Sequence, residues 1–157
     1  MSKAKNVHGT GLVLGQTGVL LRGPSGAGKS VLALTLLDRW EGRGQDAYLV
    51  SDDRVDLVSL DEKLVMQSPD TIAGKIELRG RGIVERPTTN QAPLHLVIDL
   101  VEDFARMLEE EEFSTDLLGV AVARAPIPKA GVIGLGHQML LVKEAIVALS
   151  PRSALLP

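Results

Sequence analysis

A glycine-rich segment carries the residues whose types and spacing point most directly to chemistry. It has the pattern Gly-x-x-x-x-Gly-Lys-Ser, with a short apolar run before it and a helical pattern after it. In such a loop, successive backbone N–H groups converge on phosphate oxygens, the lysine binds the β- and γ-phosphates, and the serine hydroxyl ligates Mg²⁺. The loop consists of Gly23, Pro24, Ser25, Gly26, Ala27, Gly28, Lys29 and Ser30. We therefore expect ATP, or a similar nucleotide, with Mg²⁺; the alternative is a glycine-rich helix start with an incidental lysine.

Two adjacent carboxylates, Asp52 and Asp53, close the next apolar strand pattern. In a parallel sheet, the end of that strand and the phosphate loop share one edge. Transfer of a phosphoryl group to a hydroxyl needs a proton acceptor and a metal anchor, which two carboxylates could divide between them. The alternative is a solvated turn before Arg54.

Further polar residues could join this site. In extended backbone, Glu77, Arg79 and Arg81 would share one face and could hold Mg²⁺ beside an anionic phosphate, or else form a surface charge ladder. His8 precedes the first hairpin; it could belong to the site or be only an exposed or capping residue, and the sequence favours neither. The remaining histidines lie in a strand and at a helix start, positions that favour structural roles, and the histidine spacing fits no metal site.

The elements that must position these residues follow from the hydrophobic pattern. It predicts strands over residues 10–14, 19–22, 47–50, 55–60, 64–66, 94–100 and 117–123, and helices over residues 29–40 and 137–149. Residues 68–92 are rich in Gly and Pro, which predicts a functional loop, and residues 102–112 are acidic, which predicts a helix or a mobile loop. The sum is an α/β domain with a mixed, hairpin-rich sheet and few helices.

The composition indicates one globular domain, residues 1–157, with 45% hydrophobic residues and a net charge of −3. This charge leaves no broad cationic surface, so we expect no nucleic-acid partner. The chain has no Cys, its first residues lack the apolar core of a signal peptide, and no apolar run is long enough to span a membrane. We therefore expect a cytoplasmic protein without a membrane partner.

Taken in order, the segments resemble the catalytic domain of the HPr kinase/phosphorylase family, in a short form without the family's N-terminal domain. The resemblance rests on the blocks at residues 7–10, 23–30, 50–56 and 76–84, with weaker matches at residues 104–106 and 125–129. It implies a phosphate-loop fold similar to the core of phosphoenolpyruvate carboxykinases. It also implies ATP-dependent phosphorylation of a serine on the phosphocarrier protein HPr, phosphorolysis of the product to pyrophosphate, and homo-oligomers.

The resemblance also implies roles for single residues. Lys29 would hold phosphates, Ser30 and Glu77 would hold Mg²⁺, and Asp53 would help with the metal or with orientation. Asp52 would accept the serine proton in the forward direction and return one in the reverse direction.

Three further residues complete this implied set. His8 would lie beside the proton exchange, Arg79 would belong to the catalytic signature segment, and Arg106 would meet phosphate. The sequence departs from the family near its C-terminal end, where residues 135–138, Leu-Gly-His-Gln, stand in place of a basic Gly-Arg-Asn stretch tied to dephosphorylation.

Two other functions compete with a kinase of HPr. A kinase of a small-molecule hydroxyl would use the same residues, because one sequence identifies no docking surface. A regulatory module that senses ATP would need the phosphate loop but no proton acceptor, so Asp52, Asp53 and His8 distinguish it from both kinases.

Overall fold

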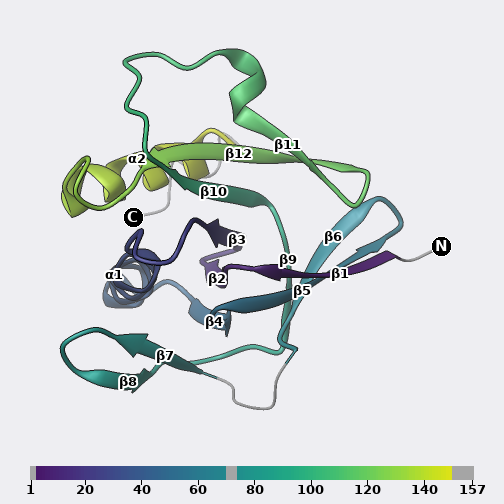
Figure 1. The fold of residues 1–157 in the computed structure, drawn as a ribbon. Coiled ribbons are helices and arrows are strands. Elements are labelled where there is room, and N and C mark those ends of the chain that lie inside the picture. Colours follow the sequence, from purple (N-terminus) through teal and green to yellow (C-terminus); the bar gives the residue numbers. More distant parts are fainter. Residues whose placement is uncertain (1–2, 70–73, 150–157) are drawn as a thin grey trace.

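The computed structural model describes residues 3–69 and 74–149 (Figure 1). In chain order its elements are β1 (Lys3–His8), β2 (Thr10–Leu14), β3 (Thr17–Arg22), α1 (Lys29–Gly42), β4 (Ala47–Ser51), β5 (Arg54–Leu60), β6 (Lys63–Gln67), β7 (Lys75–Leu78), β8 (Gly82–Glu85), β9 (Gln91–Pro93), β10 (Leu96–Val101), the 3₁₀ helix η1 (Glu110–Phe113), β11 (Ser114–Leu117), β12 (Val120–Pro128) and α2 (Leu135–Val147).

The central sheet has six strands in the order β11-β12-β10-β3-β2-β4. Strand β10 runs parallel to both β3 and β12, whereas β2 pairs antiparallel with β3 and with β4. The carboxyl ends of β3, β10 and β12 therefore meet at one edge of the sheet, and the phosphate loop follows β3 there. A half-buried ion network joins these three strands, because Asp99 accepts hydrogen bonds from Arg22 at 2.7 and 2.9 Å and from Arg124 at 2.6 Å.

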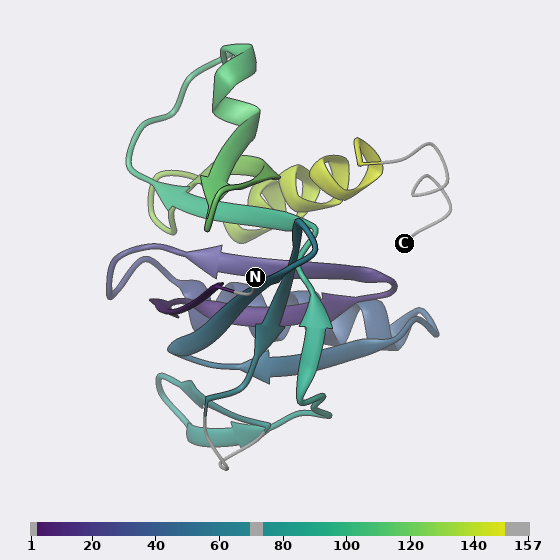
Figure 2. The same cartoon turned by 90° about the vertical axis from the view of Figure 1, so that its right-hand side faces the viewer.

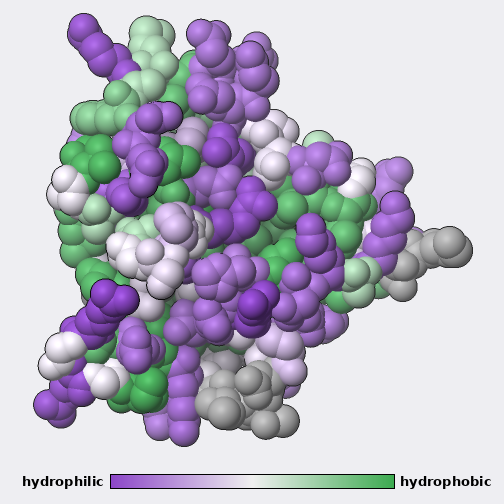
Figure 3. All heavy atoms as spheres, viewed as in Figure 1, coloured by the Kyte–Doolittle hydropathy of each residue, from purple (hydrophilic) through white to green (hydrophobic). Residues whose placement is uncertain are grey.

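Each face of the central sheet is covered by a different layer. Figures 1 and 2 show the two α-helices on one side and a second sheet, β1-β5-β6-β9, on the other. Because alternate side chains of a strand point to opposite faces, Leu21 packs in the core beneath the helices, whereas Leu20 packs in the core beneath the second sheet. Hydrophilic side chains cover much of the outer surface in Figure 3, with smaller hydrophobic areas between them.

The mixed, hairpin-rich sheet and the small number of helices confirm the expected fold class. One element was not predicted. Residues 3–8 form β1, which pairs in register with β5, and its mostly polar, exposed residues show no strand pattern. One expectation was wrong. Residues 68–92 are not a single loop, because their described part contains β7, β8 and β9; residues 70–73 lie outside the described residues.

Smaller corrections concern the second half of the chain. The predicted strand over residues 117–123 is split by a turn in which Leu118 and Gly119 have φ of 54° and 79°, so β11 and β12 form an antiparallel pair. Of the two forms expected for the acidic stretch, a helix or a mobile loop, the structure has a loop, which ends in η1. Helix α2 begins and ends two residues earlier than expected. Within the described ranges, no helix is long and apolar enough to cross a membrane.

Candidate active site

The phosphate loop lies between the carboxyl end of β3 and the first turn of α1. Gly26 and Gly28 have φ of 83° and 90°, in the left-handed region that favours glycine. A Cβ on Gly28 would lie 2.8 Å from the Cβ of Ala130, so this position also has no room for a side chain. The ammonium of Lys29 donates hydrogen bonds to the carbonyl oxygens of Gly23 at 2.7 Å and Pro24 at 3.3 Å. The lysine side chain therefore reaches back over the loop.

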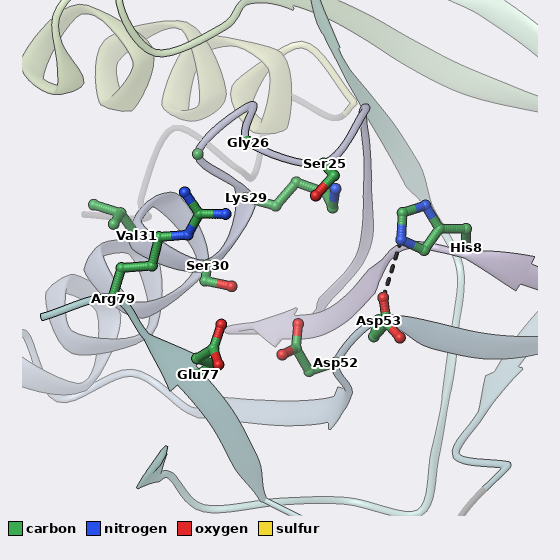
Figure 4. Close-up of a pocket in the computed structure, with 11 residues that line it drawn as sticks. His8, Ser25, Gly26, Lys29, Ser30, Val31, Asp52, Asp53, Glu77 and Arg79 are labelled. Carbon is green, nitrogen blue, oxygen red and sulfur yellow. Dashed lines mark hydrogen bonds and ion pairs between the residues drawn. The ribbon is translucent and has the colours of Figure 1, made fainter. Parts of the chain in front are cut away.

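A cavity of about 400 Å³ opens beside this loop (Figure 4). It brings together side chains from the phosphate loop, from the end of β1, from the turn after β4 and from the β7–β8 hairpin. The lining residues are His8, Ser25, Gly26, Gly28, Lys29, Ser30, Val31, Asp52, Asp53, Glu77 and Arg79. The predicted residues Gly23, Pro24 and Ala27 do not line the cavity; they shape the loop behind it, where Ala27 is buried.

Asp52 is a half-buried carboxylate that points into this cavity. Burial raises its pKa, and this effect outweighs the opposing hydrogen bonds from the Thr10 hydroxyl and from the backbone N–H groups of Asp53 and Glu77. The fully buried Thr10 donates to Asp52 at 2.9 Å. Because a general base works best when its pKa lies near the operating pH, the raised pKa suits Asp52 for accepting a proton.

Asp53 faces a different partner. Its Oδ1 lies 3.0 Å from Nε2 of His8, and both side chains are exposed. Asp53 has φ of 72°, and its carbonyl oxygen accepts a hydrogen bond from the N–H of Gly9 at 2.9 Å. The backbone is thus bent so that Asp52 and Asp53 diverge, with Asp53 directed to His8 (Figure 4).

The β7–β8 hairpin brings two of the three predicted residues into the site. Glu77 and Arg79 line the cavity, whereas Arg81 does not, because the chain turns after Leu78 and ends the alternation expected for extended backbone. In Figure 4 the carboxylates of Glu77 and Asp52 and the hydroxyl of Ser30 point toward the same part of the cavity. The described residues contain no cluster of three or more His, Cys, Asp or Glu side chains that could hold a metal by themselves. Mg²⁺ in phosphate sites needs only one or two protein carboxylates, so Ser30 and Glu77 fit it as oxygen donors.

Arg106 was also predicted to belong to the site. It is exposed in the stretch between β10 and η1 and is not among the residues that line the cavity, so its phosphate contact stays a prediction without structural support. The other two histidines make structural contacts: Nδ1 of His95 accepts a hydrogen bond from the N–H of Gly18, and the ring of His137 contacts Phe104 edge to face.

Two residues of the site were not predicted from the sequence. Thr10, which holds Asp52, lies in one of the blocks that carried the family resemblance, and that position was the only signal for it. Val31 lines the cavity and is 45% exposed, although its place in the apolar pattern of the helix suggested a core residue.

Known proteins resemble the chain in sequence and in structure. An HPr kinase/phosphorylase of Clostridium perfringens is 29% identical over 160 residues, which cover 94% of this chain and 48% of that protein. One of Burkholderia cenocepacia is 32% identical over 153 residues, covering 90% of this chain and 44% of that protein. The chain thus spans about half the length of the curated relatives it matches.

A solved structure, described as the Hpr(Ser) kinase/phosphatase from Coxiella burnetii, superimposes with a TM-score of 0.74. It is 28% identical, and the match covers 96% of this chain and 95% of that one. The sequence also matches the family described as HPr Serine kinase C-terminal domain over residues 1–149. The chain therefore belongs to the HPr serine kinase C-terminal domain family.

Proposed function

We propose that this protein transfers the γ-phosphoryl group of ATP to a serine of the phosphocarrier protein HPr. One observation carries the proposal: a phosphate loop with its lysine and a half-buried carboxylate of raised pKa line the same cavity. Relatives that align with nearly the whole chain are named HPr kinase/phosphorylase, which supports HPr as the acceptor.

The residues divide the phosphoryl transfer between them. Backbone N–H groups of the loop and the ammonium of Lys29 bind the β- and γ-phosphates. Asp52 accepts the proton of the serine hydroxyl as the serine oxygen bonds to the γ-phosphorus, and the bond from that phosphorus to the β,γ-bridging oxygen breaks to release ADP. The exposed side chains of Asp53 and His8 line the same cavity as Asp52 and could orient the incoming serine.

Magnesium completes the phosphate site in this proposal. Ser30 and Glu77 would hold the ion, which would offset the negative charge of the phosphates. Arg79 adds a further positive charge at the cavity wall. Asp53 would help with the metal or with orientation; one of its two carboxylate oxygens lies 3.0 Å from Nε2 of His8.

The same residues support the reverse reaction with phosphate as the acceptor. An oxygen of inorganic phosphate bonds to the phosphorus of phosphoserine, the bond from phosphorus to the serine oxygen breaks, and the protonated Asp52 returns its proton to that oxygen. The products are HPr with an unphosphorylated serine and pyrophosphate.

The decisive experiment incubates the protein with labelled ATP, Mg²⁺ and purified HPr, in parallel with HPr whose target serine is replaced by alanine. Label on the first acceptor alone supports the proposal. Label on both acceptors, or on neither, rejects HPr serine as the acceptor. Release of pyrophosphate from phosphorylated HPr in excess phosphate tests the reverse reaction.

A further inference from the structure

The β7–β8 hairpin carries Glu77 and Arg79 but belongs to neither large sheet. An isolated two-stranded hairpin is marginally stable in water, so other contacts must fix its position. Ile76 is 1% exposed and packs in the core shared with α1, and Leu78 and Val84 pack against the same core. Since side chains alternate along β7, burying Ile76 and Leu78 turns Glu77 toward the other face, where the cavity lies.

Apolar contacts alone leave the hairpin free to tilt on the helix, because they are not directional. A directional contact to the helix comes from Arg86, the residue directly after β8. Its Nε donates to Oδ1 of Asp38 at 2.8 Å, and its Nη2 donates to Oδ2 of Asp38 at 3.1 Å. The third nitrogen, Nη1, donates to the carbonyl oxygen of Glu85 at 2.8 Å. Such a two-point arginine–carboxylate bond fixes orientation as well as distance.

Arg86 and Asp38 connect the β7–β8 hairpin, which carries Glu77, to helix α1, which carries Ser30. Asp38 lies on α1, whose first residues are Lys29 and Ser30. The backbone N–H of Arg86 donates to the carbonyl oxygen of Gly74 at 2.9 Å, which closes the base of the hairpin.

The chain after Arg86 is tied to the strand that leads to Asp52. The N–H of Leu49 in β4 donates to the carbonyl oxygen of Pro87, and the carbonyl oxygen of Leu49 accepts from Thr89. The base of the hairpin is thus held against both α1 and β4.

We propose that Arg86 and Asp38 are a positioning pair that holds Glu77 opposite Ser30, so that both oxygens can share one Mg²⁺ bound to nucleotide. This inference rests on the proposed function, because it assumes the assigned Mg²⁺ site. Neither residue is among those that line the cavity, so their effect on the nucleotide would pass through Glu77.

The test measures binding of a fluorescent ATP analogue with and without Mg²⁺. Arg86→Ala and Asp38→Ala should each weaken binding about three- to tenfold with Mg²⁺ and less than about twofold without it. The charge-swapped double variant, Arg86→Asp with Asp38→Arg, should recover most of the loss. Arg39→Ala, which removes an exposed arginine next to Asp38 on the same helix, should bind like the wild type.

A double-mutant cycle tests whether the Arg86–Asp38 pair acts through Glu77. Glu77→Gln should weaken Mg²⁺-dependent binding, and adding Arg86→Ala to it should cause no further loss. The proposal is overturned by wild-type binding in Arg86→Ala, by equal losses with and without Mg²⁺, by an undiminished loss in the Glu77→Gln background, or by a swapped pair that recovers nothing. Thermal unfolding of each variant checks folding, and Arg86→Lys, which keeps the charge but loses the two-point bond, replaces any alanine variant that unfolds.

The HPr assay, run on the same wild-type preparation, separates the two proposals. Mg²⁺-dependent nucleotide binding without transfer to HPr rejects the proposed function and leaves the positioning test valid. Nucleotide binding that does not respond to Mg²⁺ rejects the metal assignment and the positioning pair together.

Discussion

At the residue scale, the site depends on how one carboxylate is kept ready to accept a proton. Asp52 has a raised pKa because it is partly withdrawn from water, yet the hydrogen bond from Thr10 limits that rise. The neighbouring Asp53 is exposed and bonded to His8. Two adjacent carboxylates of the same type therefore have different environments, which suits them to different tasks.

Replacing Asp52 by Asn removes the proposed proton acceptor while keeping nearly the same shape. We expect nucleotide binding to stay within about twofold of the wild type, and phosphoryl transfer to fall by roughly 10²- to 10⁴-fold. Equilibrium binding and transfer of label to HPr measure the two quantities separately. Transfer at the wild-type rate would show that Asp52 is not the base.

Replacing Thr10 by Val removes the hydroxyl that donates to Asp52 and keeps the size of the side chain. The pKa of Asp52 should then rise further, because a bond that favours its charged form is lost. A base must be deprotonated, so transfer is lost as the pH falls through this pKa, and the acidic limb of the rate profile should move to higher pH. At acidic pH we expect roughly a tenfold loss in rate. Thr10→Ser, which keeps the hydroxyl, should retain the wild-type profile; an unmoved limb in Thr10→Val contradicts the prediction.

At the scale of elements, hydrogen bonds at strand ends hold the hairpin of β2 and β3 against the chain that enters β10. His95 forms two of them: its backbone N–H donates to the carbonyl oxygen of Gly18 and its Nδ1 accepts from the N–H of Gly18, both at 2.9 Å. Partial burial lowers the pKa of His95, and Nδ1 can accept only while it carries no proton. The contact therefore makes this part of the fold sensitive to acid.

This contact predicts a pH dependence of stability. Because the pKa of His95 is lower in the folded than in the unfolded state, its contribution is complete above the unfolded value of about 6.5 and is lost as the pH falls below it toward the folded value. His95→Asn offers an amide oxygen in place of Nδ1 but does not titrate. Urea unfolding between about pH 5 and pH 7.5 should therefore show a smaller loss of stability on acidification in this variant than in the wild type. Equal losses in both proteins would contradict the role of His95.

At the scale of the whole molecule, the central sheet has to hold the phosphate loop against the layers on both faces. Asp99 lies between Arg22 and Arg124 and so connects the three strands β3, β10 and β12. Burial alone would raise the pKa of Asp99, but the bonds to the two arginines outweigh it and lower the pKa. The lowered pKa keeps Asp99 ionised, so its carboxylate can pair with both guanidinium groups.

Asp99→Ala should destabilise the fold by about 2–4 kcal/mol, because it leaves two half-buried guanidinium groups without their shared partner. The free energy of unfolding from urea titrations at neutral pH measures this. Glu102→Gln is the matched control: Glu102 is 77% exposed and pairs with Lys129, so its loss should cost about 1 kcal/mol or less. Equal effects of the two substitutions would refute the structural role of Asp99.

How much of this architecture was predictable depends on how local each feature is. The phosphate loop and α1 could be predicted because consecutive residues specify them, with glycines where φ is positive and an apolar helical pattern behind them. Strand β1 could not, because its exposed side chains show no apolar pattern and only pairing with β5 makes it a strand. Arg81 was grouped with Glu77 and Arg79 because the sequence pattern did not place the turn that follows Leu78.

The sequence by itself determined that a phosphate-binding loop precedes a helix and that carboxylates follow the next strand, since these features need only neighbouring residues. Only the tertiary structure decided what each of the two carboxylates contacts inside the cavity that both of them line. A positive φ at Asp53 separates it from Asp52, and strand pairing brings His8 to the former and Thr10 to the latter. The placement of Glu77 likewise depends on how its hairpin packs on α1. Such pairings join residues far apart in the chain, and no local pattern of residue types encodes their distance.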